Sequence, residues 1–258
     1  MEVKDKSAIV TGGASGIGFS VVQELLRKGV KLVIILDLDK SKGEVAVESL
    51  TKDFGENRSI FFVCDVSKTE EFTEIFKKIM DLYERVDILI NNAGIGDETK
   101  WELMIDINYK AMVCGTFLFM EHMGKHKGGQ GGTILNISST AGVAPLHVFP
   151  VYAGTKHAVV GFSLSLKESY EETGVRILVM CPGCTITWMT RDLSNNYLES
   201  VYKNSPFKMI MQRVEHVAEY VVKLIEKGKN GAVWVVENNE PAFTFKNPHY
   251  LENRVPID

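Results

Sequence analysis

The chain has 258 residues, 45% of them hydrophobic, and a formal net charge of −4. A chain of this length can bury one substantial core, and residues 1–258 fit a single α/β domain better than two small ones. The acidic balance argues against nucleic acid as a partner, because binding to phosphates requires a basic face.

The N-terminus and the cysteines predict a cytoplasmic protein. Residues 1–6 are charged and lead directly into an apolar segment, so they predict no signal peptide. No apolar run approaches the roughly 20 residues that a membrane span needs, and we expect no stable membrane insertion. Four scattered cysteines are too few for a disulfide framework, which favours a reducing compartment.

Short β-branched runs alternate with longer helical patterns along most of the chain. Continuously apolar strands separated by helices are typical of a parallel sheet covered on both faces. The predicted fold is therefore α/β, a single-domain Rossmann-type doubly wound sheet of about seven parallel strands. We expect strands at residues 7–11, 32–36, 60–64, 88–90, 133–137, 176–180 and 232–236, and helices at 19–28, 41–54, 70–83, 101–125, 155–172 and 215–227.

Two segments stand outside this alternation. Residues 188–213 are irregular, and we interpret them as a substrate lid that closes to exclude water from the reaction. Residues 241–258 form a C-terminal tail that contains prolines. Substrate specificity is expected to depend on these two segments.

A glycine-rich turn from Thr11 to Gly18 joins the first predicted strand to the first helix. Glycines there permit a tight turn and let backbone N–H groups and the helix N-terminus approach a pyrophosphate. Asp37 closes the second strand 19 residues past Gly18. A carboxylate there can accept hydrogen bonds from both hydroxyls of an adenosine ribose and repels a 2′-phosphate. Since no Arg or Lys lies in the turn or directly after Asp37, NAD is favoured over NADP.

Further motifs follow the later strands in a fixed order. Asn91–Gly94 follows the fourth strand, Ser138 and Ser139 follow the fifth, and the segment from Tyr152 to Lys156 begins 13 residues after Ser139. With the glycine-rich turn, they closely resemble the short-chain dehydrogenase/reductase family over roughly residues 5–240. Within that family the chain is most similar to the 15-hydroxyprostaglandin dehydrogenases and to insect alcohol and farnesol dehydrogenases.

The predicted chemistry depends on Tyr152. Oxidation of an alcohol needs a base for its O–H proton, and a free tyrosine with a pKa of about 10 is too weakly ionised near neutrality. Lys156 lies one helical turn further on the same face, and its positive charge, with that of the oxidised nicotinamide, would stabilise a phenolate and lower the pKa of Tyr152. Ser139 would hydrogen-bond the substrate oxygen. The resemblance implies that Asn108 holds a water molecule linking Lys156 to solvent.

The resemblance also implies which residues contact NAD. It places Asp65 and Val66 at the adenine, Asn92 at the ribose, and Thr185, Ile186 and Thr187 at the nicotinamide amide. No metal site is expected, because the Cys181–Cys184 pair has neither a second pair nor a nearby histidine. The expected cofactor-binding residues are Gly12, Ser15, Gly16, Ile17, Gly18, Asp37, Leu38, Asp65, Val66, Asn92, Ala93, Gly94, Tyr152, Lys156, Pro182, Gly183, Thr185, Ile186 and Thr187.

The expected substrate is an apolar, lipid-like alcohol such as farnesol, contacted by Ser139, Phe149, Tyr152 and Met189. Phe149 stands where the prostaglandin enzymes carry a polar Gln that can address a hydroxyl. Because Phe149 offers only apolar area, it argues against a prostaglandin. 15-Hydroxyprostaglandins and steroid alcohols remain alternatives. A catalytically silent NAD-binding regulatory protein is a further alternative, although such a protein would be expected to lack part of the Ser–Tyr–Lys set.

The resemblance also predicts an assembly. Members of the family commonly dimerise through two long helices, which here would be residues 101–125 and 155–172. The second carries more apolar positions than one sheet-facing stripe needs. We therefore expect a homodimer or a homotetramer.

Overall fold

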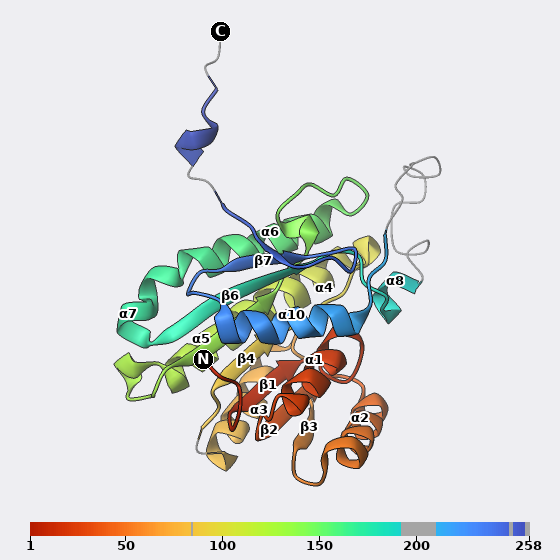
Figure 1. The fold of residues 1–258 in the computed structure, drawn as a ribbon, viewed down its shortest axis with the longest axis vertical. Helices are drawn as coiled ribbons and strands as arrows, with labels where there is room; N and C mark the ends of the chain where they lie inside the picture. The colour runs from red at the N-terminus through yellow and green to blue at the C-terminus, as the bar shows by residue number, and fades with distance from the viewer. Residues whose placement is uncertain (84, 192–209, 248–249, 256–258) are drawn as a thin grey trace.

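The structure is a computed structural model that describes residues 1–83, 85–191, 210–247 and 250–255. Its centre is an eight-stranded sheet in the order β3-β2-β1-β4-β5-β6-β7-β8 (Figure 1). The first seven strands are parallel, and β8 pairs with β7 in the antiparallel direction. The strands are β1 Ser7–Thr11, β2 Leu32–Asp37, β3 Ser59–Val63, β4 Ile88–Asn91, β5 Gly132–Ile137, β6 Val175–Pro182, β7 Val233–Val236 and β8 Phe243–Thr244.

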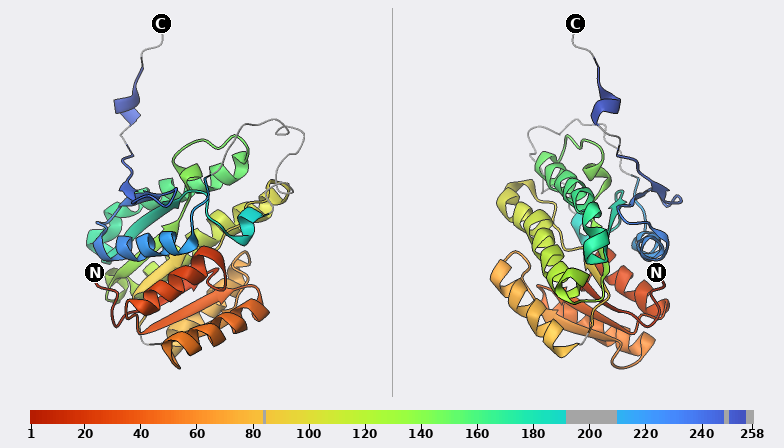
Figure 2. Two further views of the ribbon diagram at one scale, coloured as in Figure 1. Left: turned by 45° about the vertical axis from the view of Figure 1, so that its right-hand side comes forward. Right: turned by 90° about the vertical axis from the view of Figure 1, so that its left-hand side faces the viewer.

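Helices cover both faces of this sheet (Figure 2). The α/β architecture predicted from the sequence is therefore confirmed, with β8 as an additional short strand. The α-helices are α1 Gly16–Arg27, α2 Lys40–Phe54, α3 Thr69–Leu82, α4 Trp101–Ile105, α5 Ala111–Met123, α6 Pro150–Ser165, α7 Tyr170–Thr173, α8 Trp188–Arg191 and α10 Val214–Lys227.

The strands are apolar throughout because each face of the sheet has its own core. In β4, Ile88 and Ile90 pack into the core beneath α1 and α10, whereas Leu89 packs into the opposite core with α3 and α5. Successive side chains of a strand point to opposite faces, so a sheet covered on both sides needs apolar residues at every position. This requirement explains the unbroken apolar runs in the sequence.

The long predicted helix at residues 101–125 is a composite. Between α4 and α5 the turns of Asp106–Lys110 are π-helical, and α5 ends at Met123. A π-helical turn widens the helix locally and is frequent at functional sites. The π-helical segment contains the buried side chain of Asn108.

The bounds of one predicted helix were wrong. The helix predicted at residues 155–172 begins at Pro150 and ends at Ser165, and short helical turns follow it. Pro150 occupies the first position, where its missing N–H costs nothing. A separate point concerns the helical run Glu98–Met123, which is 26 residues long and, by length and composition alone, apolar enough to cross a membrane. Within the fold, 44% of its qualifying 18-residue window is buried. Phe119, which lies in this run, is buried in the same core cluster as Phe72 and Phe76 of α3. The apolar residues of the run therefore pack against the neighbouring helix.

The two segments predicted to be irregular are described in part. Most of the predicted lid, residues 192–209, lies outside the described residues. The segment before it forms α8, and the segment after it returns to form a bridge between Gln212 and Thr185. In the tail, β8 closes the edge of the sheet, and the chain beyond it leads away from the body of the molecule (Figure 1).

The strand order reverses between β1 and β4. From β1 the chain continues outward to β2 and β3, and β4 then lies on the opposite side of β1. In open parallel sheets such a reversal leaves a crevice at the carboxyl ends of the strands, where ligands bind. The motifs at the ends of β1, β2, β4, β5 and β6 therefore meet at one edge of the sheet.

Candidate active site

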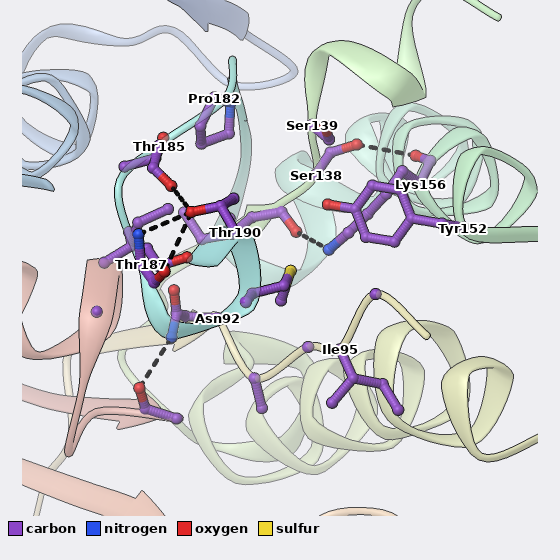
Figure 3. Close-up of a pocket in the computed structure, with 18 of the residues that line it drawn as sticks. Asn92, Ile95, Ser138, Ser139, Tyr152, Lys156, Pro182, Thr185, Thr187 and Thr190 are labelled. Carbon is purple, nitrogen blue, oxygen red and sulfur yellow. Dashed lines mark hydrogen bonds between the residues drawn. The ribbon is translucent and has the colours of Figure 1, made fainter. Parts of the chain in front are cut away.

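A cavity of about 920 Å³ opens at this edge of the sheet (Figure 3). Its walls come from the glycine-rich turn after β1, the ends of β2, β4, β5 and β6, the first two turns of α6, and α8. Figure 3 shows Asn92 and Ile95 on one side of this space and Ser139, Tyr152 and Lys156 on another.

The glycine-rich turn has the geometry needed for a close backbone approach. Gly12 has a φ of +64°, and a Cβ atom on Gly18 would lie 2.1 Å from the carbonyl oxygen of Gly12. Only glycine fits either position. At the start of α1, Ser15 makes no capping hydrogen bond with its side chain, and the first turn contains no acidic residue. The N-terminus of α1 is thus left open toward the cavity, as an anionic pyrophosphate requires.

Carboxylates lie where the adenosine ribose is expected. Asp37 lines the cavity at the end of β2, and its Oδ2 accepts a hydrogen bond from the backbone N–H of Ala14 at 3.0 Å. A basic residue also lines the cavity here, which the sequence did not predict. It is Lys42, in the first turn of α2. Its Nζ forms an ion pair with Asp39 at 3.1 Å, which neutralises the charge locally.

Asn92 holds the turn together from the neighbouring strand. Its side-chain Nδ2 donates to the carbonyl oxygens of Thr11 and Gly12, at 2.9 Å and 3.1 Å. The hydroxyl of Thr11 in turn accepts from the backbone N–H groups of Asn92 and Ala93. Asn92 lines the cavity, as expected, but its amide N–H groups bind the end of β1.

Ser139, Tyr152 and Lys156 meet at the cavity wall. Ser139 follows β5, while Tyr152 lies in the first turn of α6 and Lys156 one turn later. The Ser139 side chain lies close enough to the Tyr152 phenol to favour its ionised form. The Nζ of Lys156 lies 5.6 Å from the centre of the Tyr152 ring and donates to the carbonyl oxygen of Ile137 at 3.1 Å (Figure 3). Ser138 supports this arrangement, since its hydroxyl donates to the carbonyl oxygen of Lys156 at 2.9 Å.

Burial dominates the acidity of both ionisable groups. It raises the pKa of Tyr152 to about 12, although the nearby Ser139 side chain acts in the opposite direction. It also lowers the pKa of Lys156 to about 8. In the protein without cofactor, desolvation of the phenolate is the largest influence on this pKa. The expected lowering by Lys156 together with the oxidised nicotinamide stays a prediction.

Asn108 lies behind the cavity wall. Its side chain is 2% exposed and makes a pair of hydrogen bonds with Ile95, accepting from the backbone N–H at 2.8 Å and donating to the carbonyl at 2.9 Å. It also donates to the hydroxyl of Thr155. The π-helical turn thus places an amide where it fixes the loop after β4. Its expected role in holding a water molecule remains a prediction.

Most of the expected site residues lie together. Every residue expected at the cofactor, substrate and catalytic positions lines the cavity except Gly18, Asn108 and Ile186. Gly18 acts through close packing against Gly12, Asn108 acts through Ile95, and the side chain of Ile186 is exposed.

Sequence reasoning missed most of the apolar wall. Phe149 and Met189 line the cavity as expected, and several further apolar residues accompany them. Their segments showed no periodic pattern, so no sequence signal could assign them to the cavity. These additional apolar residues are Ile95, Ala141, Ala144, Pro145 and Leu146, whereas Trp188 and Ile210 belong to the predicted lid segment and also line the cavity.

Cys181 lies in β6 and Cys184 follows that strand. Neither forms a disulfide in the part of the chain that the structure describes. Burial raises the pKa of Cys181 to about 12, so this thiol stays protonated near neutrality. Within the described ranges, no three His, Cys, Asp or Glu side chains come together as a metal site would require.

The site can be compared with known proteins. The sequence model of the family described as short chain dehydrogenase matches residues 6–198. This chain belongs to that family. It is 35% identical over 223 residues to the human (Homo sapiens) protein named 15-hydroxyprostaglandin dehydrogenase [NAD(+)], covering 86% of this chain and 80% of that protein. The Bos taurus protein of the same name is 33% identical over 250 residues, covering 93% and 94%.

Solved structures support the fold of this short-chain dehydrogenase. Levodione reductase superimposes with a TM-score of 0.77 at 21% identity, covering 91% of this chain and 97% of that one. A short-chain type dehydrogenase/reductase from Mycobacterium ulcerans gives a TM-score of 0.75 at 24% identity, covering 93% and 90%. At this level of identity the structures establish the shared architecture alone.

Proposed function

We propose that this short-chain dehydrogenase uses NAD to interconvert an apolar secondary or allylic alcohol and its carbonyl product. The observation that carries the proposal is the convergence of Ser139, Tyr152 and Lys156 on a cavity that also contains the dinucleotide-binding turn. A catalytically silent protein would not need all three groups at that wall.

The residues present fit NAD. The open N-terminus of α1 and the close approach at Gly12 suit the pyrophosphate, while Asp37 suits the ribose of the adenosine half. When bound, the cofactor supplies the ring that accepts or donates hydride, together with a positive charge in its oxidised form. The names of the similar proteins from Homo sapiens and Bos taurus also support NAD.

The chain's own residues position the alcohol and move its proton. Ser139 holds the substrate oxygen beside the phenol oxygen of Tyr152, which takes the proton during oxidation and returns it during reduction. A pKa of about 12 keeps the phenol protonated in the protein alone, ready to act as an acid. With its pKa of about 8, Lys156 remains charged at neutrality and supplies a nearby positive charge that favours the phenolate.

The apolar wall indicates the class of substrate. Phe149 and Leu146 line the cavity, and Met189 reaches it from α8, so the space beside the phenol offers hydrocarbon surface. Burial of such surface favours apolar ligands by about 25 cal/mol per Å². An isoprenoid alcohol such as farnesol fits this wall, as does a steroid alcohol.

A 15-hydroxyprostaglandin is the second candidate, favoured by the proteins of that name that are similar over most of this chain. A screen of the purified protein with NAD would separate the candidates. It would compare kcat/KM for farnesol, a graded series of aliphatic secondary alcohols, a steroid alcohol and a 15-hydroxyprostaglandin. Turnover of none of these alcohols with either NAD or NADP would contradict the proposal.

We also propose that the protein is a cytoplasmic homodimer or homotetramer. Phe117 on α5 is 52% exposed and forms an edge-on contact with Phe162 on α6, with ring centres 5.7 Å apart. An exposed aromatic side chain that contacts a half-buried one on the adjacent helix is suited to burial against a second copy. None of the four cysteines forms a disulfide in the described residues, which is consistent with a reducing compartment.

A further inference from the structure

The helix that carries Tyr152 has no capping group of its own. α6 begins at Pro150, and the preceding Phe149 makes no capping hydrogen bond with its side chain. Pro150 has no N–H to satisfy, and the N–H of Ala153 already donates to the carbonyl of Phe149 at 2.9 Å. The backbone N–H groups of Val151 and Tyr152 therefore need acceptors from elsewhere in the chain.

Both acceptors belong to Glu98, which lies more than 50 residues earlier. Its Oε2 accepts from the N–H of Val151 at 3.1 Å, and its Oε1 accepts from the N–H of Tyr152 at 2.8 Å. Glu98 is 8% exposed, so water cannot readily replace the carboxylate. A negative charge at a helix N-terminus is favourable, which explains why this buried carboxylate is tolerated at α6.

Glu98 also belongs to the loop that borders the cavity. This loop is fixed at Asn92 by hydrogen bonds to the end of β1, and at Ile95 by the paired hydrogen bonds with Asn108. Glu98 adds a third attachment, to the catalytic helix. The loop after β4 and the first turn of α6 are thus held together as one unit.

We infer that Glu98 is a positioning residue for Tyr152, which it holds at the cavity by capping the first turn of α6. The inference rests on the proposed role of Tyr152 in proton transfer. Lys156 lies one turn further along α6 and keeps its own hydrogen bond to Ile137, so it does not depend on this cap. Removal of the carboxylate therefore loosens the phenol without displacing the ammonium group.

Glu98→Ala tests the inference. We expect kcat to fall by about 10- to 100-fold, because a small displacement of a reacting group costs that much. The dissociation constant for NAD, measured by titration of the protein fluorescence, should be unchanged. Glu98→Gln keeps one acceptor oxygen, so its kcat should lie between those of Glu98→Ala and the wild type.

Asp97→Ala is the matched control. Asp97 is the neighbouring carboxylate and accepts from the N–H of Thr99, with no hydrogen bond to α6. Its replacement disturbs the same short helical turn and should leave kcat unchanged. If Glu98→Ala does not fold, a comparison of kcat between Glu98→Gln and Asp97→Ala still tests whether Glu98 positions Tyr152.

Three outcomes would overturn the inference. The first is a wild-type kcat in Glu98→Gln and in any Glu98→Ala that folds. The second is a fall in NAD affinity as large as the fall in kcat, and the third is an equal loss of kcat in Asp97→Ala. Tyr152→Phe is measured in parallel. Normal turnover by Tyr152→Phe would remove the proposed function itself, whereas an inactive Tyr152→Phe beside a normal Glu98→Ala would remove only the role of Glu98.

Discussion

The ammonium nitrogen of Lys156 lies 5.6 Å from the centre of the Tyr152 ring, on the same helix and against the same cavity. Burial acts on the two groups in opposite directions, raising the pKa of Tyr152 to about 12 and lowering that of Lys156 to about 8. Both shifts favour the neutral forms. Ionisation of the phenol near neutrality therefore requires a positive charge beyond that of Lys156, which the oxidised cofactor would supply.

The first prediction concerns proton transfer. Tyr152→Phe removes the phenol oxygen and should lower kcat by about 10²- to 10⁴-fold, the usual contribution of a general acid–base group. The affinity for NAD and the melting temperature should stay close to those of the wild type. Steady-state kinetics together with a direct NAD titration would check this. Near-normal turnover would show that another group carries the proton.

The second prediction concerns the buried lysine in the protein without cofactor. The folded-state pKa of Lys156 is about 8, below its ordinary value of 10.5. The charged ammonium therefore lowers the free energy of unfolding, and this penalty has its full size below pH 8. This penalty disappears as the pH rises toward 10.5. Relative to the wild type, Lys156→Met should gain unfolding free energy at pH 7, and the gain should shrink by roughly 2–3 kcal/mol by pH 10.

Denaturant titrations of both proteins across this pH range would measure the difference between their free energies of unfolding. The other titrating groups are present in both proteins, so their contributions cancel in this difference. Lys77→Met, at an exposed position of α3, is the control and should leave the pH dependence unchanged. A difference between Lys156→Met and the wild type that does not vary with pH would show that burial does not shift the pKa of Lys156.

The third prediction concerns the choice of cofactor. Asp37→Ala should raise the ratio of kcat/KM for NADP to that for NAD by more than about tenfold, because like charges cost several kcal/mol when juxtaposed. Removing Asp39 as well frees Lys42 from its ion pair at the cavity and should raise the ratio further. A native preference for NADP would contradict this account of Asp37.

The fourth prediction concerns the substrate. Phe149 is 8% exposed and lines the cavity. Phe149→Gln should lower kcat/KM for an apolar alcohol by about 10- to 100-fold, the value of a buried phenylalanine side chain. The variant should lose less with a 15-hydroxyprostaglandin, whose polar groups can use the amide. Equal losses for both substrates would indicate that Phe149 does not contribute to specificity.

The fifth prediction concerns assembly. Phe117→Glu places a charge at the exposed member of the aromatic pair of α5 and α6 and should convert the expected dimer into monomers at micromolar concentration. Sedimentation velocity of the wild type and the variant would measure this. Lys77→Glu, on α3, is the control for added surface charge. A wild-type protein that sediments as a monomer would contradict the proposal.

The sequence determined the parts of this protein that depend on local pattern. Unbroken apolar runs between helices predicted a parallel sheet covered on both faces, because only such strands bury both of their sides. Glycines that need a positive φ or a missing Cβ identified the turn after β1. The four-residue spacing of Tyr152 and Lys156 placed them on one helical face without knowledge of any long-range contact.

Only the tertiary structure decided which distant segments meet. Glu98 caps a helix more than 50 residues away, Lys42 joins the cavity beside Asp37, and irregular segments supply the apolar wall. The pKa values of Tyr152 and Lys156 also depended on the fold, because desolvation is set by atoms that surround a group in space. Contacts of this kind leave no periodic trace in the sequence, since each depends on how whole strands and helices pack.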